Sequence, residues 1–251
     1  MKVDTHIHLY DEKYEDIIDE VIKSAIDKGV KRIIVNGIDK NTSIKSIKLA
    51  NKYDYLYVAI GLHPSEINSN EENDLSWIYD LAKDDKVIAI GEIGLDYYWD
   101  KTYNDLQKEI FIKQIKIANE LNLPVIVHSR DAHKDTFDIM KKYQTKGILH
   151  CYQSSLELAK EYVKLGYFLG IGGVLTFKNS KVIKDVVREI SIDYLLTETD
   201  GPYLTPSPFR GKLNRPEYIS YIINEISNIK NLDKDVIEEK IFNNYKRLFK
   251  E

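Results

Sequence analysis

Short apolar segments rich in β-branched residues recur along the chain, and helical patterns separate them. The segments lie roughly 27 residues apart, close to the length of about 30 residues that one strand–helix–strand unit needs. They are continuously apolar rather than alternating, as is typical of parallel strands with both faces buried. Eight strands are predicted, at Lys2–Ile7, Arg32–Asn36, Leu56–Gly61, Val87–Gly91, Pro124–His128, Gly147–His150, Tyr167–Gly172 and Tyr194–Glu198.

Between these segments, apolar residues recur three and four positions apart, which predicts amphipathic helices. Gly29 closes the first helix, and Asp233 is the expected N-cap of the last. The clearest helices are predicted at Glu12–Lys28, Asp105–Leu121, Pro216–Ile229 and Asp233–Phe249.

Eight strand–helix units in 251 residues are typical of a (β/α)8 TIM barrel. The alternative is an open, doubly wound sheet, but the first predicted strand is not followed by the Gly-rich phosphate-binding loop of that fold. The chain contains no low-complexity tract, internal sequence repeat or convincing linker. We therefore expect one domain over residues 1–251.

Hydrophobic residues make up 43% of the chain and charged residues 30%, as in ordinary soluble globular proteins. The 36 Lys and Arg against 40 Asp and Glu give a net charge of -4, so no broad basic surface indicates a nucleic-acid or membrane partner. The single cysteine, Cys151, excludes a disulfide-built or Cys-rich zinc module and fits a reducing compartment. With no membrane span or secretory signal in the sequence, we expect a cytoplasmic location and no obligate protein partner.

Histidines and carboxylates occupy the ends of the predicted strands at which (β/α)8 barrels place their active sites. His6 and His8 lie two residues apart at the first strand, so both imidazoles face one side and can share a cation. Glu92 follows the fourth strand, where a buried carboxylate is costly unless it is paired or bound to metal.

The same placement recurs at three later strands. His128 ends the fifth strand, His150 ends the sixth, and Asp200 follows the eighth. Singly, each has a structural explanation: a hydrogen-bonded core histidine for His128 or His150, and a helix N-cap for Asp200. Together, four histidines and two carboxylates at one rim are enough donors for two divalent cations with positions left open for substrate.

Several stretches match one family in the family's order: Val3–His8, Gly61–Pro64, Gly91–Tyr97, Pro124–Ala132, His150–Cys151 and Glu198–Leu204, with Arg210–Asn214 as a basic segment after the eighth strand. In these stretches the chain resembles the TatD-type metal-dependent deoxyribonucleases over essentially its whole length. It departs from them at Tyr152–Gln153, where the family has an aromatic residue, often Phe, then Ser or Thr and Gly. The resemblance implies a TIM-barrel hydrolase in which Glu92 bridges two metals and the ligands are His6, His8, Glu92, His128, His150 and Asp200.

Two divalent metal ions per chain are therefore expected. Imidazoles suit zinc and manganese, whereas carboxylates and water suit magnesium and manganese. We expect Mn or Mg to support activity and Zn to be a candidate for the metal that purifies with the protein. Glu92 stands where many other binuclear barrel hydrolases use a carbamylated lysine, so no modification is required. Glu198 is expected to orient a ligand or water, with a buried ion pair as the alternative.

Other polar residues near these strand ends are expected to serve the substrate or the fold. His63, in the turn after the third strand, is predicted to contact a phosphate or water, and Arg130 and Arg210 are predicted phosphate clamps. His133 is expected a turn into the following helix, on a solvent-exposed face. Cys151 is expected to be a buried or structural thiol.

The leading hypothesis is hydrolysis of DNA phosphodiesters, in which metal-activated water removes nucleotides from single-stranded or frayed 3′ ends. Glu92 and Asp200 are the expected catalytic residues, with Asp200 as metal ligand and proton acceptor. Tyr97–Trp99 could stack on a base or pack in its loop. The resemblance also covers proteins proposed as D-aminoacyl-tRNA deacylases, so ester hydrolysis on aminoacyl-tRNA is a second hypothesis, and RNA stays open as a substrate. A non-catalytic, metal-stabilised binding barrel is disfavoured, because a structural site needs fewer ligands.

Overall fold

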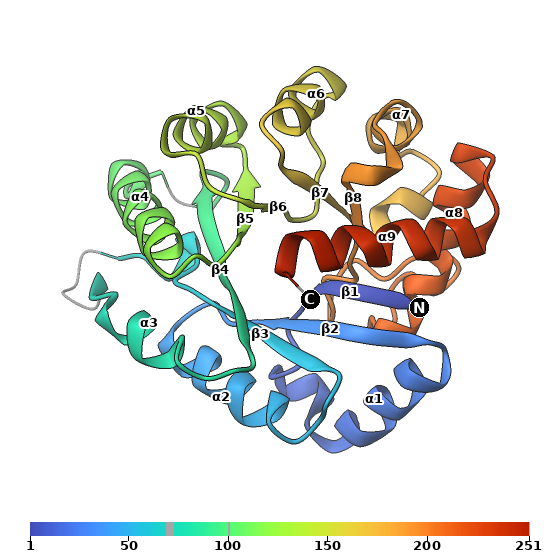
Figure 1. Ribbon diagram of the computed structural model, residues 1–251, viewed down its shortest axis with the longest axis horizontal. Helices are drawn as coiled ribbons and strands as arrows, with labels where there is room; N and C mark the ends of the chain where they lie inside the picture. Colours follow the sequence, from blue (N-terminus) through green and yellow to red (C-terminus); the bar gives the residue numbers. More distant parts are fainter. Residues whose placement is uncertain (69–72, 100, 251) are drawn as a thin grey trace. The chain divides into compact units, whose positions relative to one another are not determined.

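The computed structural model describes residues 1–68, 73–99 and 101–250 (Figure 1). Within these residues, strands and helices alternate along the chain. The strands are β1 (Lys2–Ile7), β2 (Val30–Asn36), β3 (Leu56–Ile60), β4 (Val87–Asp96), β5 (Val125–Arg130), β6 (Gly147–Leu149), β7 (Phe168–Ile171) and β8 (Leu195–Thr197). All eight predicted strands are confirmed, most of them to within two residues at each end.

The helices follow the predicted apolar periodicity. They are α1 (Ile18–Asp27), α2 (Lys40–Ala50), α3 (Ser76–Leu81), α4 (Asn104–Glu120), α5 (His133–Tyr143), α6 (Leu156–Lys164), α7 (Lys181–Glu189), α8 (Ile219–Lys230) and α9 (Lys234–Phe249). The helix predicted at Glu12–Lys28 is divided into a 3-10 turn, Glu12–Ile17, and α1, because the Asp11 carboxylate accepts the Lys13 N–H and caps a separate first turn. Asp233 is the N-cap of α9 by position, although within the described chain its side chain makes no capping hydrogen bond.

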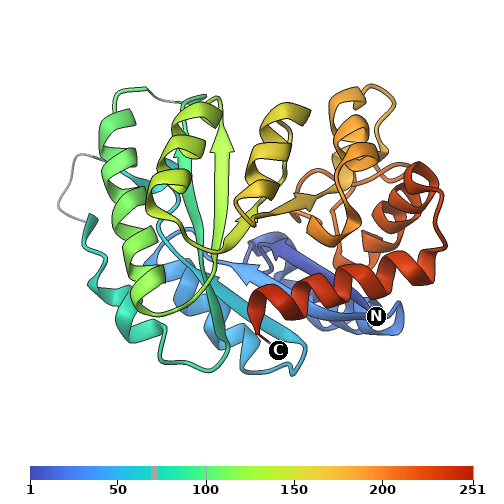
Figure 2. The same cartoon turned by 45° about the horizontal axis from the view of Figure 1, so that its top comes forward.

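The chain divides into two compact units, Met1–Val35 with His150–Glu251, and Asn36–Leu149. In the second unit, β3 to β6 pair in parallel in chain order. Helix α4 packs along β4, and α5 packs along β5 (Figures 1 and 2). These contacts bury the apolar stripes that predicted the helices.

Strand β4 runs five residues beyond its predicted end at Gly91 and pairs with β5 as far as Asp96 and Arg130. Glu92 therefore lies within the strand and not after it. The extension depends on Gly94, whose φ is +141°, because a Cβ there would lie 2.0 Å from the His128 carbonyl oxygen. Gly94 thus permits a close approach of β4 and β5.

In the first unit, β1 pairs with β2 and β7 pairs with β8, in parallel. Strands β1 and β8 are joined through side chains: Thr197 Oγ1 donates to the Val3 carbonyl at 2.8 Å, and Thr5 Oγ1 donates to the Thr197 carbonyl at 3.2 Å. Beyond the strands, the His8 N–H donates to the Gly201 carbonyl at 2.8 Å. The residues that follow β1 and β8 are thereby held next to each other.

Eight parallel strands that alternate with helices form the (β/α)8 TIM barrel fold class, which confirms the predicted class over the open sheet. A single domain over residues 1–251 stays a prediction. None of the helices in the described part of the chain is long and apolar enough to cross a bilayer.

Candidate metal sites

The first unit holds a cluster of imidazoles and one carboxylate at the ends of β1 and β8. His6 Nε2 and His8 Nε2 lie 3.3 Å apart, which confirms that the two-residue spacing directs both rings to one side. Asp200 Oδ1 lies 3.7 Å from each of these nitrogens. The ring of His150 stacks on that of His6 with 3.7 Å between centroids. His6, His150 and Asp200 each offer a ligand atom, and these three atoms lie within 4.8 Å of one another.

Asp200 reaches this cluster through its backbone conformation. Its φ is +58°, in the left-handed region that Asp tolerates better than most residues. Its N–H donates to the His6 carbonyl at 2.9 Å, which places the carboxylate beside the histidines. The N-cap explanation for Asp200 is wrong, because the next helical segment of the described chain begins at Pro216.

Two buried acids lie behind this cluster. Asp4 accepts hydrogen bonds from the Thr199 N–H at 2.9 Å and the Thr199 hydroxyl at 2.6 Å. Burial raises the pKa of Asp4 to about 8, although the hydrogen bonds from Thr199 oppose that rise. Glu198 Oε1 lies 3.1 Å from His150 Nδ1 and accepts the Cys151 N–H at 2.5 Å. Glu198 is thus placed to orient the ring of His150. This position agrees with the first of the two roles that the sequence left open for Glu198.

The second unit holds candidate ligands of its own at the ends of β3, β4 and β5. Glu92 is 3% exposed, and its Oε1 lies 3.0 Å from His128 Nδ1 and 3.4 Å from His63 Nε2. On the other side of the ring, His128 Nε2 lies 2.9 Å from Asp96 Oδ2. His128 is therefore held between two carboxylates.

Asp96 received no role from the sequence, although it lies in a stretch singled out there. Burial favours a higher pKa for Asp96, but hydrogen bonds from His128 and from the Tyr98 N–H outweigh it and lower the pKa below its ordinary value. A carboxylate on the far nitrogen of a ligating histidine fixes the ring and raises its basicity. The sequence feature that could have identified Asp96 is its spacing from Glu92, since residues four apart on a strand share a face.

His63 also lies in this cluster, but its tautomer favours a different role from ligation. The Ser65 N–H donates to His63 Nδ1 at 3.1 Å, so that nitrogen is unprotonated. In the neutral ring, Nε2 then carries the proton and faces Glu92 as a donor. A protonated nitrogen has no lone pair for a cation, which supports the predicted contact to substrate or water.

The two arginines proposed as phosphate clamps are exposed, Arg130 at the end of β5 and Arg210 in the segment between β8 and Pro216. Arg130 stacks on Tyr98, with 3.7 Å from its guanidinium carbon to the ring centroid, and lies 5.3 Å from the ring of Trp99. Trp99 is 73% exposed, so this aromatic pair has open surface for stacking. Arg210 lies over Phe177 at 4.1 Å. Stacking holds each guanidinium in place and leaves its N–H donors available.

The expected position of His133 is wrong. His133 is the first residue of α5 and is half-buried, with its Nδ1 3.2 Å from Ser129 Oγ. Burial lowers its pKa. The helix starts later than expected, so the ring lies against β5 and is partly covered.

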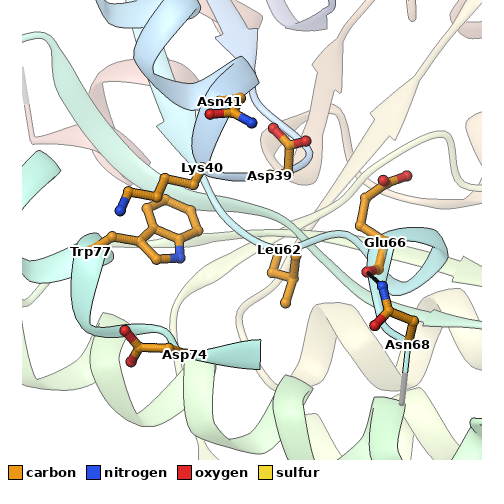
Figure 3. A pocket seen from close by; sticks show the side chains of 8 residues that line it. All are labelled: Asp39, Lys40, Asn41, Leu62, Glu66, Asn68, Asp74 and Trp77. Atoms are coloured by element: carbon orange, nitrogen blue, oxygen red, sulfur yellow. Dashed lines mark hydrogen bonds between the residues drawn. The ribbon is translucent and has the colours of Figure 1, made fainter. Parts of the chain in front are cut away.

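A cavity of about 410 Å³ lies beside the His63 loop (Figure 3). Trp77 and Leu62 supply its apolar surface, and among the lining residues that the structure describes the charged groups are three carboxylates against one lysine. That balance disfavours phosphate there. The lining residues are Asp39, Lys40, Asn41, Leu62, Glu66, Asn68, Asp74 and Trp77.

The donors of both clusters fit divalent cations. Imidazole nitrogens and carboxylate oxygens converge in each, and His6, Glu92 and His150 are all less than 9% exposed. Such buried, closely spaced donors are costly unless a cation or proton is shared among them.

The chain is similar to known metal-dependent hydrolases in both sequence and structure. The family model described as TatD related DNase matches residues 3–250. YabD of Bacillus subtilis, an uncharacterized metal-dependent hydrolase, is 46% identical and covers 100% of this chain and 99% of its own. YcfH of Escherichia coli, described in the same words, is 34% identical, with 98% and 95% covered. The crystal structure of YjjV, a TatD homologue from Escherichia coli, has a TM-score of 0.93 at 30% identity, with 100% and 98% covered.

Proposed function

The chain belongs to the TatD-related family of metal-dependent hydrolases, and from that premise we propose that it is a deoxyribonuclease that removes nucleotides from DNA 3′ ends. The observation that supports hydrolytic chemistry is the pair of imidazole–carboxylate clusters at the active-site ends of the strands. The cofactors are two divalent cations per chain, Mg, Mn or Zn. That Glu92 bridges them stays a prediction.

The residues that would hold these cations are His6, His8, Glu92, His128, His150 and Asp200. When bound, such cations polarise a phosphodiester and supply a water of lowered pKa. The Asp200 carboxylate takes the proton of the attacking water. It is suited to this because its oxygen lies 3.7 Å from two imidazole nitrogens and the side chain is 15% exposed, so water reaches it.

The remaining residues bind and orient the DNA. The His63 Nε2–H donates to a phosphate oxygen, since Nδ1 is occupied by the Ser65 N–H. Arg130 and Arg210 bind flanking phosphates through guanidinium groups that aromatic rings hold in place. The exposed Tyr98 and Trp99 stack on a terminal base, which requires a single-stranded or frayed end. A local basic patch is sufficient for a substrate held by a few terminal phosphates.

The test is digestion of a 5′-labelled single-stranded oligonucleotide by the Mn²⁺-loaded protein. We expect a ladder that shortens from the 3′ end and stops at a phosphorothioate placed internally. The matched RNA, tested in parallel, decides the preference between the two nucleic acids. Intact DNA with fully loaded protein contradicts the proposal.

One observation favours ester hydrolysis on D-aminoacyl-tRNA as the second candidate. The cavity beside His63 carries an excess of carboxylates, which suits the ammonium group of an aminoacyl ester better than a phosphate. Release of D-Tyr from D-Tyr-tRNA, without cleavage of the oligonucleotide, would select this function.

A further inference from the structure

Helix α4 carries two buried glutamines, Gln107 and Gln114, which are 4% and 0% exposed. They are seven residues apart, close to two helical turns, so both side chains leave the same face of the helix. A buried amide needs partners for its oxygen and its NH₂ group. The partners here are backbone groups at the candidate metal site.

Gln114 holds the peptide groups of Leu62. The Leu62 N–H donates to Gln114 Oε1 at 2.7 Å, and Gln114 Nε2 donates to the Leu62 carbonyl at 3.0 Å. Leu62 immediately precedes His63, whose Nε2 faces Glu92. The backbone from which His63 projects is therefore fixed to α4.

Gln107 makes the same pair of contacts to Asp96. The Asp96 N–H donates to Gln107 Oε1 at 2.9 Å, and Gln107 Nε2 donates to the Asp96 carbonyl at 3.0 Å. The Asp96 carboxylate in turn lies 2.9 Å from His128 Nε2. Gln107 thus sets the backbone of the residue that orients a metal-binding histidine.

The end of the β3–β4 ladder explains why glutamines are needed. The described pairing of β3 with β4 reaches Ile60 and Ile90, whereas β4 continues to Asp96. Beyond that point, the N–H and C=O of Leu62 and Asp96 point to α4 side chains. A glutamine amide offers one donor and one acceptor in the arrangement of a peptide group, so it replaces a neighbouring strand.

We propose that Gln107 and Gln114 are positioning residues, each fixing one backbone segment of the metal-binding cluster through a two-bond amide clamp. Gln114 acts on His63, and Gln107 acts on His128 through Asp96. The catalytic consequence rests on the proposed function, but the effect on the metal and on the His63 ring does not.

The two clamps predict different defects when each glutamine is replaced by methionine, which has a similar length and no amide. Gln107→Met should weaken Mn²⁺ binding about 10-fold or more, because the partner of a ligating histidine is loosened. Gln114→Met should leave the Mn²⁺ Kd within about 2-fold, since His63 is a donor and not a ligand. It should instead shift the ¹⁵N resonances of the His63 ring and lower kcat about 10-fold, with KM little changed.

The matched control is Phe111→Leu, a substitution at a fully buried position of α4 between the two glutamines. It should lower the Tm without changing the Mn²⁺ Kd, the His63 resonances or kcat. Should either methionine variant fail to fold, Gln107→Glu and Gln114→Glu keep an oxygen for the backbone N–H, while the ionised carboxylate loses the donor and places a charge next to the backbone carbonyl. The same two defects are then expected.

Mn²⁺ titration and histidine NMR of the full-length protein need no substrate. Unchanged Mn²⁺ affinity in the Gln107 variants, or unchanged His63 resonances in the Gln114 variants, would overturn the proposal even if DNA is cleaved. Conversely, a protein that cleaves no DNA but shows both expected changes retains the clamps and loses only the proposed function. If Phe111→Leu lost as much Mn²⁺ affinity as the Gln107 variants, general destabilisation would explain the loss and the proposal would be overturned.

Discussion

The ring of His128 is held from two sides, because both of its nitrogens face carboxylates. Glu92 lies 3.0 Å from Nδ1, and Asp96 lies 2.9 Å from Nε2. If one carboxylate orients the ring, the other shares a cation with it. Asp200 differs, since the imidazoles next to it lie 3.7 Å away and its side chain is 15% exposed. Substitutions of Glu92 and Asp200 are therefore expected to cause different defects.

Glu92→Gln keeps the shape of the side chain and removes its charge, so both metal occupancy and activity should fall. Asp200→Asn should cost activity more than occupancy, because an amide oxygen still coordinates weakly but accepts no proton. The expected loss in kcat is about 10²–10⁴-fold. The measurement pairs metal stoichiometry with single-turnover cleavage for each variant. Near-normal cleavage by Asp200→Asn at full metal content would remove Asp200 from the proton transfer.

His133 provides a pH-dependent prediction. Burial lowers its pKa in the folded protein, so the neutral ring is favoured and the contribution of His133 to stability is present above the unfolded pKa of about 6.5. The contribution is lost as the pH falls toward the folded pKa. The Tm difference between wild type and His133→Ala should therefore be largest above about pH 7 and shrink below pH 6, while turnover at pH 7.5 stays nearly intact. A 100-fold loss in kcat would place His133 in the chemistry.

At the level of the elements, the extension of β4 beyond Gly91 brings Glu92 and Asp96 onto one face of one strand. Helix α4 then supports that extension through Gln107 on the side where the pairing with β3 has ended. Gly94, between the two carboxylates, leaves no room for a Cβ against the His128 carbonyl of β5. The geometry of the cluster in the second unit therefore depends on this strand continuing.

Gly94→Ala should destabilise the protein by roughly 3 kcal/mol, because the new Cβ would lie 2.0 Å from the His128 carbonyl oxygen. The matched control is Gly166→Ala, which also has a positive φ, +87°, but where a Cβ would have nothing within 4 Å. That variant should lose only about 1 kcal/mol from backbone strain. Urea unfolding of both variants measures the difference, and equal losses would remove the close approach as the cause.

For the whole molecule, metal binding is expected to contribute to stability as well as to activity. The donors are buried, and a ligand at 100 times its Kd stabilises a folded protein by about 2.7 kcal/mol. Adding excess Mn²⁺ to chelator-treated protein should therefore raise the Tm. Mg²⁺ at the same concentration should raise it less, because imidazole donors prefer manganese. A Tm that does not respond to either cation would argue against the two clusters as metal sites.

Much of this organisation was predictable from the sequence. Runs of buried β-branched residues located all eight strands, and the two-residue spacing of His6 and His8 predicted their shared side. Two of the local expectations that failed concern the second unit. The fourth strand was predicted to end at Gly91, whereas it continues to Asp96, and His133 was placed on an exposed helix face. Both errors lie at the ends of elements. There, the hydrogen-bond partner of the next residue decides whether a strand continues or a helix begins.

The sequence by itself determined the fold class and which residues face the active-site ends of the strands, because hydrophobic periodicity records which side of each element is buried. Only the tertiary structure decided the partners. Asp96 on His128, Glu198 beside His150, and Gln114 on the backbone before His63 pair residues 32 to 52 positions apart. Periodicity has no information about such pairs, since a hydrogen bond depends on where two separate elements pack and not on the local pattern of either one.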